Sequence, residues 1–144
     1  MSILGLVILA FAVLFIFIFN DMILKRNVVE SAYAAVRGLL KMRCDFLDTL
    51  TADNGRISAM QEIAAAMRKA DIAGQIVLDA QLTALTTEYL AENDGAEELA
   101  ELEEKLVEAR AMYNSAVSSF NRAAGVQPGK LVTKLRKWPL YPEW

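Results

Sequence analysis

The residue types that carry most enzyme chemistry are scarce in this chain of 144 residues. It has no histidine and one cysteine, Cys44, which lies between Arg43 and Asp45. A zinc site, a disulfide framework and a histidine-activated nucleophile all need residues that are missing from this sequence. Cys44 has neither a base nor a resolving cysteine, so we interpret it as an inert thiol. The sequence predicts no enzyme activity, no metal site and no cofactor.

The acidic residues do not form a catalytic pattern either. Glu103 and Glu104 are neighbours and point apart on a helix, and together with Glu101 and Glu108 we interpret them as a solvated face. The glycine-containing segments 54–55 and 125–129 lack the spacing of a phosphate-binding loop. The chain has 18 acidic and 15 basic residues, a net charge of −3, which disfavours nucleic acid as a partner.

Four asparagines have a spacing that suits assembly. Asn20 and Asn27 are seven residues apart, and so are Asn114 and Asn121, so each pair lies on one stripe of a helix. An amide in a helical seam must be hydrogen-bonded and commonly fixes register or oligomeric state. We predict that these asparagines, with Tyr113 and Phe120, form contacts between subunits of a homo-oligomer. Solvated or capping amides are the alternative.

A membrane helix is the first element that must position these residues. Residues 3–19 are an unbroken apolar run of 17, the lower limit for crossing the hydrocarbon core, and 14 of them are Ile, Leu, Val or Phe. No basic residue precedes the run and no small-residue cleavage site follows it, which favours an uncleaved anchor over a signal peptide. A buried core helix is the third alternative, although such helices usually keep a polar stripe.

The charges beside this run predict its orientation. Lys25 and Arg26 follow the run, and no charged side chain precedes it. Because an excess of positive charge normally stays in the cytoplasm, we predict a single-pass protein with a cytoplasmic body.

The segment 20–125 has the pattern of a helical bundle. Turn residues at 53–55 and 93–95 divide it into three antiparallel helices of about residues 20–52, 57–92 and 96–124, the first continuous with the anchor. Ser58 with Gln61 and Asp94 with Glu97 are candidate N-terminal caps. Gly74 marks a possible break in the second helix, which would give four helices. The third helix has the clearest heptad: Leu99, Leu102, Leu106, Ala109, Tyr113, Ala116, Phe120 and Ala124.

Residues 126–144 form a basic, aromatic tail. Leu131, Leu135 and Trp138 fall on one side of a possible short amphipathic helix. The tail can lie on an anionic membrane surface, dock on a partner or pack as a strap on its own bundle. Our candidates for membrane-interface or docking residues are Lys25, Arg26, Lys130, Lys134, Arg136, Lys137, Trp138, Tyr141 and Trp144.

Two stretches resemble the LemA family. Residues 19–21 lead to residues 26–28, with Arg43-Cys44-Asp45-Phe46-Leu47 beyond, and residues 109–117 (ARAMYNSAV) lead to Phe120-Asn121 and Pro128. The pattern departs from the family at Asp48-Thr49, where Pro-Asn is usual, and at Leu90. The resemblance implies a bacterial, membrane-anchored helical bundle and identifies no enzyme.

These features together predict an all-α protein of the bacterial inner membrane, or of a membrane derived from it. We predict a scaffold or structural element of the envelope that acts by self-assembly and helix-to-helix contacts. The alternative is an adaptor that recruits an unidentified membrane enzyme or transporter through the basic, aromatic tail. The expected partners are the lipid bilayer and further copies of the chain.

Overall fold

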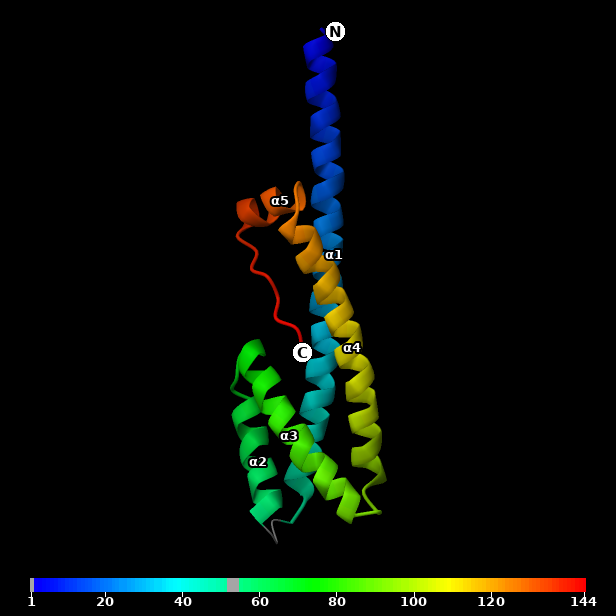
Figure 1. The fold of residues 1–144 in the computed structure, drawn as a ribbon, viewed down its shortest axis with the longest axis vertical. Helices are drawn as coiled ribbons and strands as arrows, with labels where there is room; N and C mark the ends of the chain where they lie inside the picture. Colours follow the sequence, from blue (N-terminus) through cyan, green and yellow to red (C-terminus); the bar gives the residue numbers. More distant parts are fainter. Residues whose placement is uncertain (1, 52–54) are drawn as a thin grey trace. The chain divides into compact units, whose positions relative to one another are not determined.

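The computed structural model describes residues 2–51 and 55–144, and its described residues form helices, turns and an extended tail without any strand. The all-α prediction is therefore confirmed. The helices are α1 (Ile3–Thr49), α2 (Gly55–Met67), α3 (Ile72–Glu92), α4 (Glu97–Gly125) and α5 (Gly129–Arg136) (Figure 1). The chain divides into two compact units: the first comprises Met1–Ala32 and Tyr113–Glu143, and the second comprises Tyr33–Met112 and Trp144.

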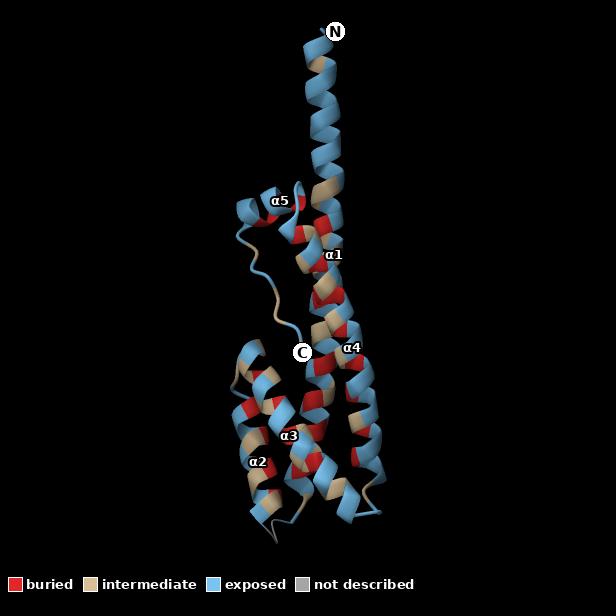
Figure 2. Ribbon diagram, in the orientation of Figure 1, coloured by how far each residue is buried: buried red, intermediate tan, exposed pale blue. Residues whose placement is uncertain are grey.

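The apolar run begins the single long helix α1, which continues without interruption to Thr49. This helix is long and apolar enough to cross a membrane, by length and composition, and none of its most apolar window is buried (Figure 2). The alternative of a buried core helix is therefore wrong for this run. Burial along α1 begins at Met22 and continues on one side.

The first unit packs α1 up to Ala32 with α5 and the second half of α4. Its core contains Met22, Val29, Val117, Phe120 and Val132, all at most 1% exposed. Gly129, at the start of α5, lies against the backbone of α4: a Cβ added there would come within 2.1 Å of the Ala123 carbonyl oxygen. Only glycine fits this close approach of two backbones.

The second unit contains the remainder of α1, α2, α3 and the first half of α4. The helices α2 and α3 lie side by side as an antiparallel hairpin (Figure 1). Its apolar core draws on all four helices and comprises Val36, Leu40, Leu47, Met60, Ala64, Met67, Leu82, Leu99, Leu102 and Leu106. All eight heptad positions predicted for residues 96–124 are buried, so that pattern is confirmed.

The prediction of one helix over 57–92 is wrong. The helix ends at Met67 and a new one starts at Ile72, with Asp71 as its N-cap: the Asp71 carboxylate accepts a hydrogen bond from the Gly74 N–H at 2.8 Å. A Cβ at Gly74 would lie 3.0 Å from the Ala70 Cβ, so glycine gives the cap the space it needs. The chain therefore folds with one reversal more than the three-helix prediction.

The predicted caps also differ. Gln61 does not complete a capping box with Ser58, because α2 has already begun at Gly55; its side-chain amide instead donates to the Leu47 and Leu50 carbonyls at the end of α1, each at 3.0 Å. Asp94 lies in the turn before α4 and is not adjacent to its first residue, Glu97. The predicted turn at residues 53–54 lies outside the described residues.

Two candidate sites, the tail clasp and the buried ion network

The main chain of the C-terminal tail is hydrogen-bonded to two side chains of α4 in the first unit. The Asn121 side-chain amide donates to the Tyr141 carbonyl at 2.8 Å, and the Tyr141 N–H donates to the Asn121 side-chain oxygen at 3.1 Å. The Tyr113 hydroxyl donates to the Pro142 carbonyl at 2.9 Å. Asn121 thus pairs with an extended backbone as a neighbouring strand would. We call this arrangement, completed by Arg26, Glu30, Phe120 and Trp138, the tail clasp.

The Tyr141 side chain joins the tail to α1. Its hydroxyl donates to the Glu30 carboxylate at 2.6 Å and accepts a hydrogen bond from Arg26 Nε at 3.3 Å. Burial raises the pKa of Tyr141, and the hydrogen bond to the Glu30 carboxylate raises it further, while the Arg26 hydrogen bond lowers it. The hydroxyl therefore stays protonated and keeps its donor role at neutral pH.

Aromatic rings complete the tail clasp. The Trp138 ring stacks on Phe19, with 6.5 Å between centroids, and lies 6.4 Å from Phe120. The Tyr141 ring meets Phe120 edge-on at 5.3 Å. The Arg26 guanidinium lies 5.0 Å from the Trp138 ring centroid, a cation–π distance. These contacts place Trp138 beside the last residue of the apolar run.

The structure brings together six of the predicted site residues, Arg26, Tyr113, Phe120, Asn121, Trp138 and Tyr141. They form a strap packed on its own bundle, which was one of the alternatives for the tail. The Asn121 side chain, predicted to contact another subunit, is hydrogen-bonded to the Tyr141 main chain within the same chain, and a contact between subunits stays a prediction. The extra reversal at residues 68–71 allows the second half of α4 to pack with α1 up to Ala32 in the first unit.

The other predicted residues lie outside the tail clasp. Asn20 and Asn27 are exposed on α1, whereas Asn114 is half-buried. Lys25 pairs with Asp21 at 2.6 Å, and the Arg136 guanidinium lies 5.3 Å from the Phe19 ring centroid. Lys130, Lys134 and Lys137 are exposed. Trp144 belongs to the second unit.

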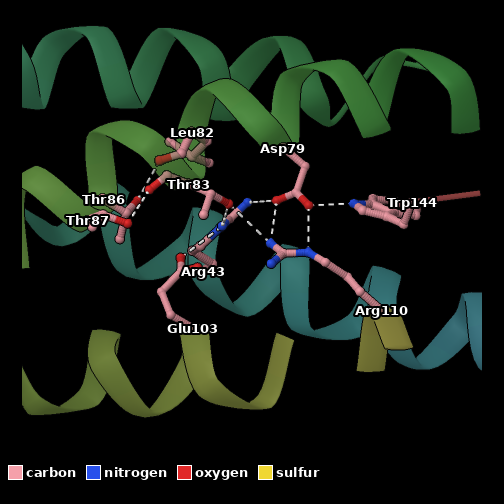
Figure 3. Close-up of polar contacts among 9 residues, drawn as sticks. All are labelled: Arg43, Asp79, Leu82, Thr83, Thr86, Thr87, Glu103, Arg110 and Trp144. Atoms are coloured by element: carbon pink, nitrogen blue, oxygen red, sulfur yellow. Dashed lines mark hydrogen bonds and ion pairs between the residues drawn. The ribbon is translucent and has the colours of Figure 1, made fainter. Parts of the chain in front are cut away.

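A second cluster, not predicted from the sequence, lies in the second unit (Figure 3). Arg43 of α1 and Asp79 of α3 are 0% and 2% exposed and form an ion pair. Arg43 also bonds to Glu103 of α4 at 2.8 Å, and Arg110 of α4 pairs with the second Asp79 oxygen at 2.7 Å. The Trp144 indole N–H donates to Asp79 as well. We call Arg43, Asp79, Glu103 and Arg110 the buried ion network.

The buried ion network has balanced charge, with two guanidinium groups and two carboxylates. Thr83 adds its hydroxyl as an acceptor for Arg43 and Arg110, each at 3.2 Å. Ion pairs of this kind become costly when one partner is lost, because a buried charge then remains without compensation. Among the described residues, no group of three or more His, Cys, Asp or Glu side chains is placed to hold a metal. The arrangement joins α1, α3 and α4.

Sequence reasoning missed this network because its members are common surface residues. Glu103 was assigned to the solvated face, and that assignment is wrong, since it is half-buried against Arg43. One signal was available: Gln75, Asp79, Leu82 and Thr86 follow helical spacing, and all four are buried. A polar stripe that continues an apolar one indicates side chains with buried partners.

Cys44, next to Arg43, is 2% exposed. Burial raises the pKa of its thiol, and the charge of Arg43 opposes this shift only in part. The group is therefore protonated at neutral pH and shielded from reagents.

No family model, curated protein or solved structure matches this chain. The resemblance to the LemA family stays a prediction that rests on the sequence motifs alone. Those motifs supply Arg43, Arg110, Tyr113 and Asn121, which take part in the two clusters described above.

Proposed function

We propose that this protein is a membrane-anchored helical scaffold of the bacterial envelope that acts by self-assembly and has no catalytic role. The apolar start of α1 is its single-pass anchor in the inner membrane, or in a membrane derived from it. Lys25 and Arg26 keep the body in the cytoplasm, following the distribution of positive charge in membrane proteins. The helix α1 contributes residues to both compact units.

An exposed stripe on α1 carries the proposal of self-assembly. Asn20, Leu24, Asn27 and Ser31 are all exposed and recur in steps of four, three and four residues, as in a helical seam. Leu24 and its neighbour Val28 are 64% and 56% exposed, which is much apolar surface for a face without a partner. Asn20 and Asn27 would supply hydrogen bonds between helices beside the membrane.

The mass of the full-length protein in lipid nanodiscs tests this proposal. We expect wild-type protein to be oligomeric, and the double variant Asn20→Ala, Asn27→Ala to shift towards monomer. The control variant Gln81→Ala, Gln127→Ala removes two amides that are exposed elsewhere and should leave the mass unchanged. A monomeric wild type would overturn self-assembly, and an oligomer that tolerates the loss of Asn20 and Asn27 would exclude this stripe as its seam.

The adaptor alternative keeps one supporting observation. The aromatic residues of the tail contact their own bundle, but Leu131, Leu135 and Leu140 are 52%, 67% and 62% exposed beside basic residues. Leu131→Glu with Leu135→Glu tests this surface without touching the tail clasp. If the variant forms normal oligomers but loses a co-purifying membrane protein, the adaptor is favoured. If it keeps both the oligomers and that protein, the scaffold is favoured.

A further inference from the structure

Two neighbouring hollows in the first unit are lined by residues of α1, of α4 and of the segment that leads from α4 into α5. One has a volume of about 390 Å³ and is lined chiefly by apolar residues, among them Phe17, Ile18, Met22 and Val126, with Asp21 as its acidic residue. The other, of about 510 Å³, is lined by Lys25 and Arg122 together with Ser115, Ser118 and Ser119. Ala123 and Val126 belong to both linings, so the two hollows are neighbours. Each has the size of a small-ligand site.

The order of the two hollows along α1 matches the order of groups in a membrane lipid. Phe17 and Ile18 belong to the apolar run, whereas Lys25 follows its end by six residues, about 9 Å along a helix. If the run spans the membrane, the apolar hollow lies at the edge of the hydrocarbon and the polar hollow lies at the depth of the headgroups.

The charges around the polar hollow select the ligand. Lys25 and Arg122 are cationic, and Asp21, which pairs with Lys25 at 2.6 Å, leaves one net positive charge. A phosphodiester carries one negative charge, and serine hydroxyls donate hydrogen bonds to its oxygens or to a headgroup hydroxyl. Arg122 is exposed and free to turn towards such a ligand.

We propose that this groove binds one anionic phospholipid, with its phosphodiester between Lys25 and Arg122 and an acyl chain in the apolar hollow. The site rests on the proposed membrane anchoring. It would attach α4 to the bilayer at a point distinct from the anchor itself and would fix the first unit at one depth.

A photoreactive lipid tests the site directly. The full-length protein is reconstituted in phosphatidylcholine nanodiscs that contain a minor fraction of phosphatidylglycerol with a photoreactive acyl chain, and cross-linked peptides are identified by mass spectrometry. We expect labelling within residues 17–22 or 123–129. Lys25→Gln and Arg122→Gln should each lower the yield about fivefold, as expected for one basic residue at a membrane surface.

The control is Arg37→Gln with Lys41→Gln, which removes one arginine and one lysine exposed on α1 in the second unit. Its labelling should equal that of the wild type. If the Lys25→Gln and Arg122→Gln variants are labelled as strongly as the wild type, the proposed site is wrong. Loss of labelling on addition of inorganic phosphate at constant ionic strength would overturn the lipid assignment in favour of free phosphate. Alkaline extraction of the same samples reports anchoring separately, so a protein that stays in the membrane without labelled peptides contradicts the groove alone.

Discussion

The tail clasp and the buried ion network both hold distant segments together, but they do so with different physics. The tail clasp uses hydrogen bonds to main-chain atoms and ring contacts among half-buried groups, such as Asn121 and Tyr141. The buried ion network uses full charges, with Arg43 and Asp79 removed from water. A neutral hydrogen bond contributes about 1 kcal/mol, whereas removing one partner of a buried ion pair costs about 3–5 kcal/mol.

This difference implies two modes of failure. Loss of one contact in the tail clasp leaves groups that water can reach, so only the tail should open. Loss of one charge in the buried ion network leaves another charge stranded among three helices, so the whole second unit should lose stability.

The largest effect should follow Asp79→Ala. Both Arg43 and Arg110 lose their shared carboxylate, and Arg43 keeps only Glu103 as an anionic partner. We expect the free energy of unfolding to fall by about 3–5 kcal/mol, measured by urea denaturation of the full-length protein in detergent.

Asp45→Ala is the control for Asp79→Ala. Asp45 is exposed and pairs with the exposed Arg68 at 3.2 Å, so its loss should cost less than about 1 kcal/mol. Equal losses in the two variants would contradict the idea that burial makes the buried ion network costly to break.

A smaller and local effect should follow Asn121→Ala. The variant removes both hydrogen bonds to the Tyr141 main chain, which together contribute about 1–3 kcal/mol. We expect faster hydrogen exchange of the Tyr141 amide, with no change for amides of the second unit. The control Gln81→Ala removes an exposed amide of α3 and should leave the exchange of the Tyr141 amide and of the second unit unchanged. Faster exchange throughout the protein would show that the tail clasp stabilises the whole fold and not the tail alone.

The two clusters also differ in how far the sequence predicts them. The tail clasp is built from amide, aromatic and basic side chains whose types and spacing are unusual in the sequence. Six of its members were therefore predicted as site residues from the sequence alone. Their partners were not predicted, because the chain reversal at residues 68–71 depends on Asp71 capping onto Gly74, and a lone aspartate before a helical pattern is common. The burial of α4 was predictable because its apolar spacing is almost perfect.

The buried ion network escaped prediction for another reason. Arginine, aspartate and glutamate are the usual residues of a helix surface, and whether one of them is buried depends on which helix faces it. Glu103 and Glu104 show this clearly: they are adjacent and chemically identical, yet one bonds to Arg43 and the other is exposed. Only the arrangement of α1, α3 and α4 distinguishes them.

Substitution of Glu103 and Glu104 tests the difference between these two neighbours. Glu103→Gln keeps the shape of the side chain but replaces the ion pair with Arg43 by a hydrogen bond from the charged guanidinium to a neutral amide oxygen. Because Glu103 is only half-buried and Arg43 keeps Asp79 as an anionic partner, we expect a loss of about 1 kcal/mol in the free energy of unfolding, less than for Asp79→Ala. Glu104→Gln should stay within about 0.5 kcal/mol of the wild type, as exposed substitutions do. The urea series used for Asp79→Ala measures both. If the two variants lose the same free energy of unfolding, Glu103 behaves as a solvated residue, as the sequence predicted.

The smallest effect concerns Cys44, which lies beside the buried ion network without joining it. Burial raises the pKa of this thiol in the folded protein above its value in the unfolded chain, so its contribution to stability is complete at pH values below the unfolded pKa and is lost as the pH rises through the folded pKa. Cys44→Ala should therefore show a weaker fall in stability than the wild type when the pH is raised from neutral into the alkaline range.

A maleimide should also react at Cys44 at least about tenfold more slowly than at a cysteine placed by Ser58→Cys in a Cys44→Ala background, because the reagent needs an exposed thiolate and Ser58 is exposed. Equal rates would mean that the second unit opens around Arg43 far more readily than a network of buried charges allows.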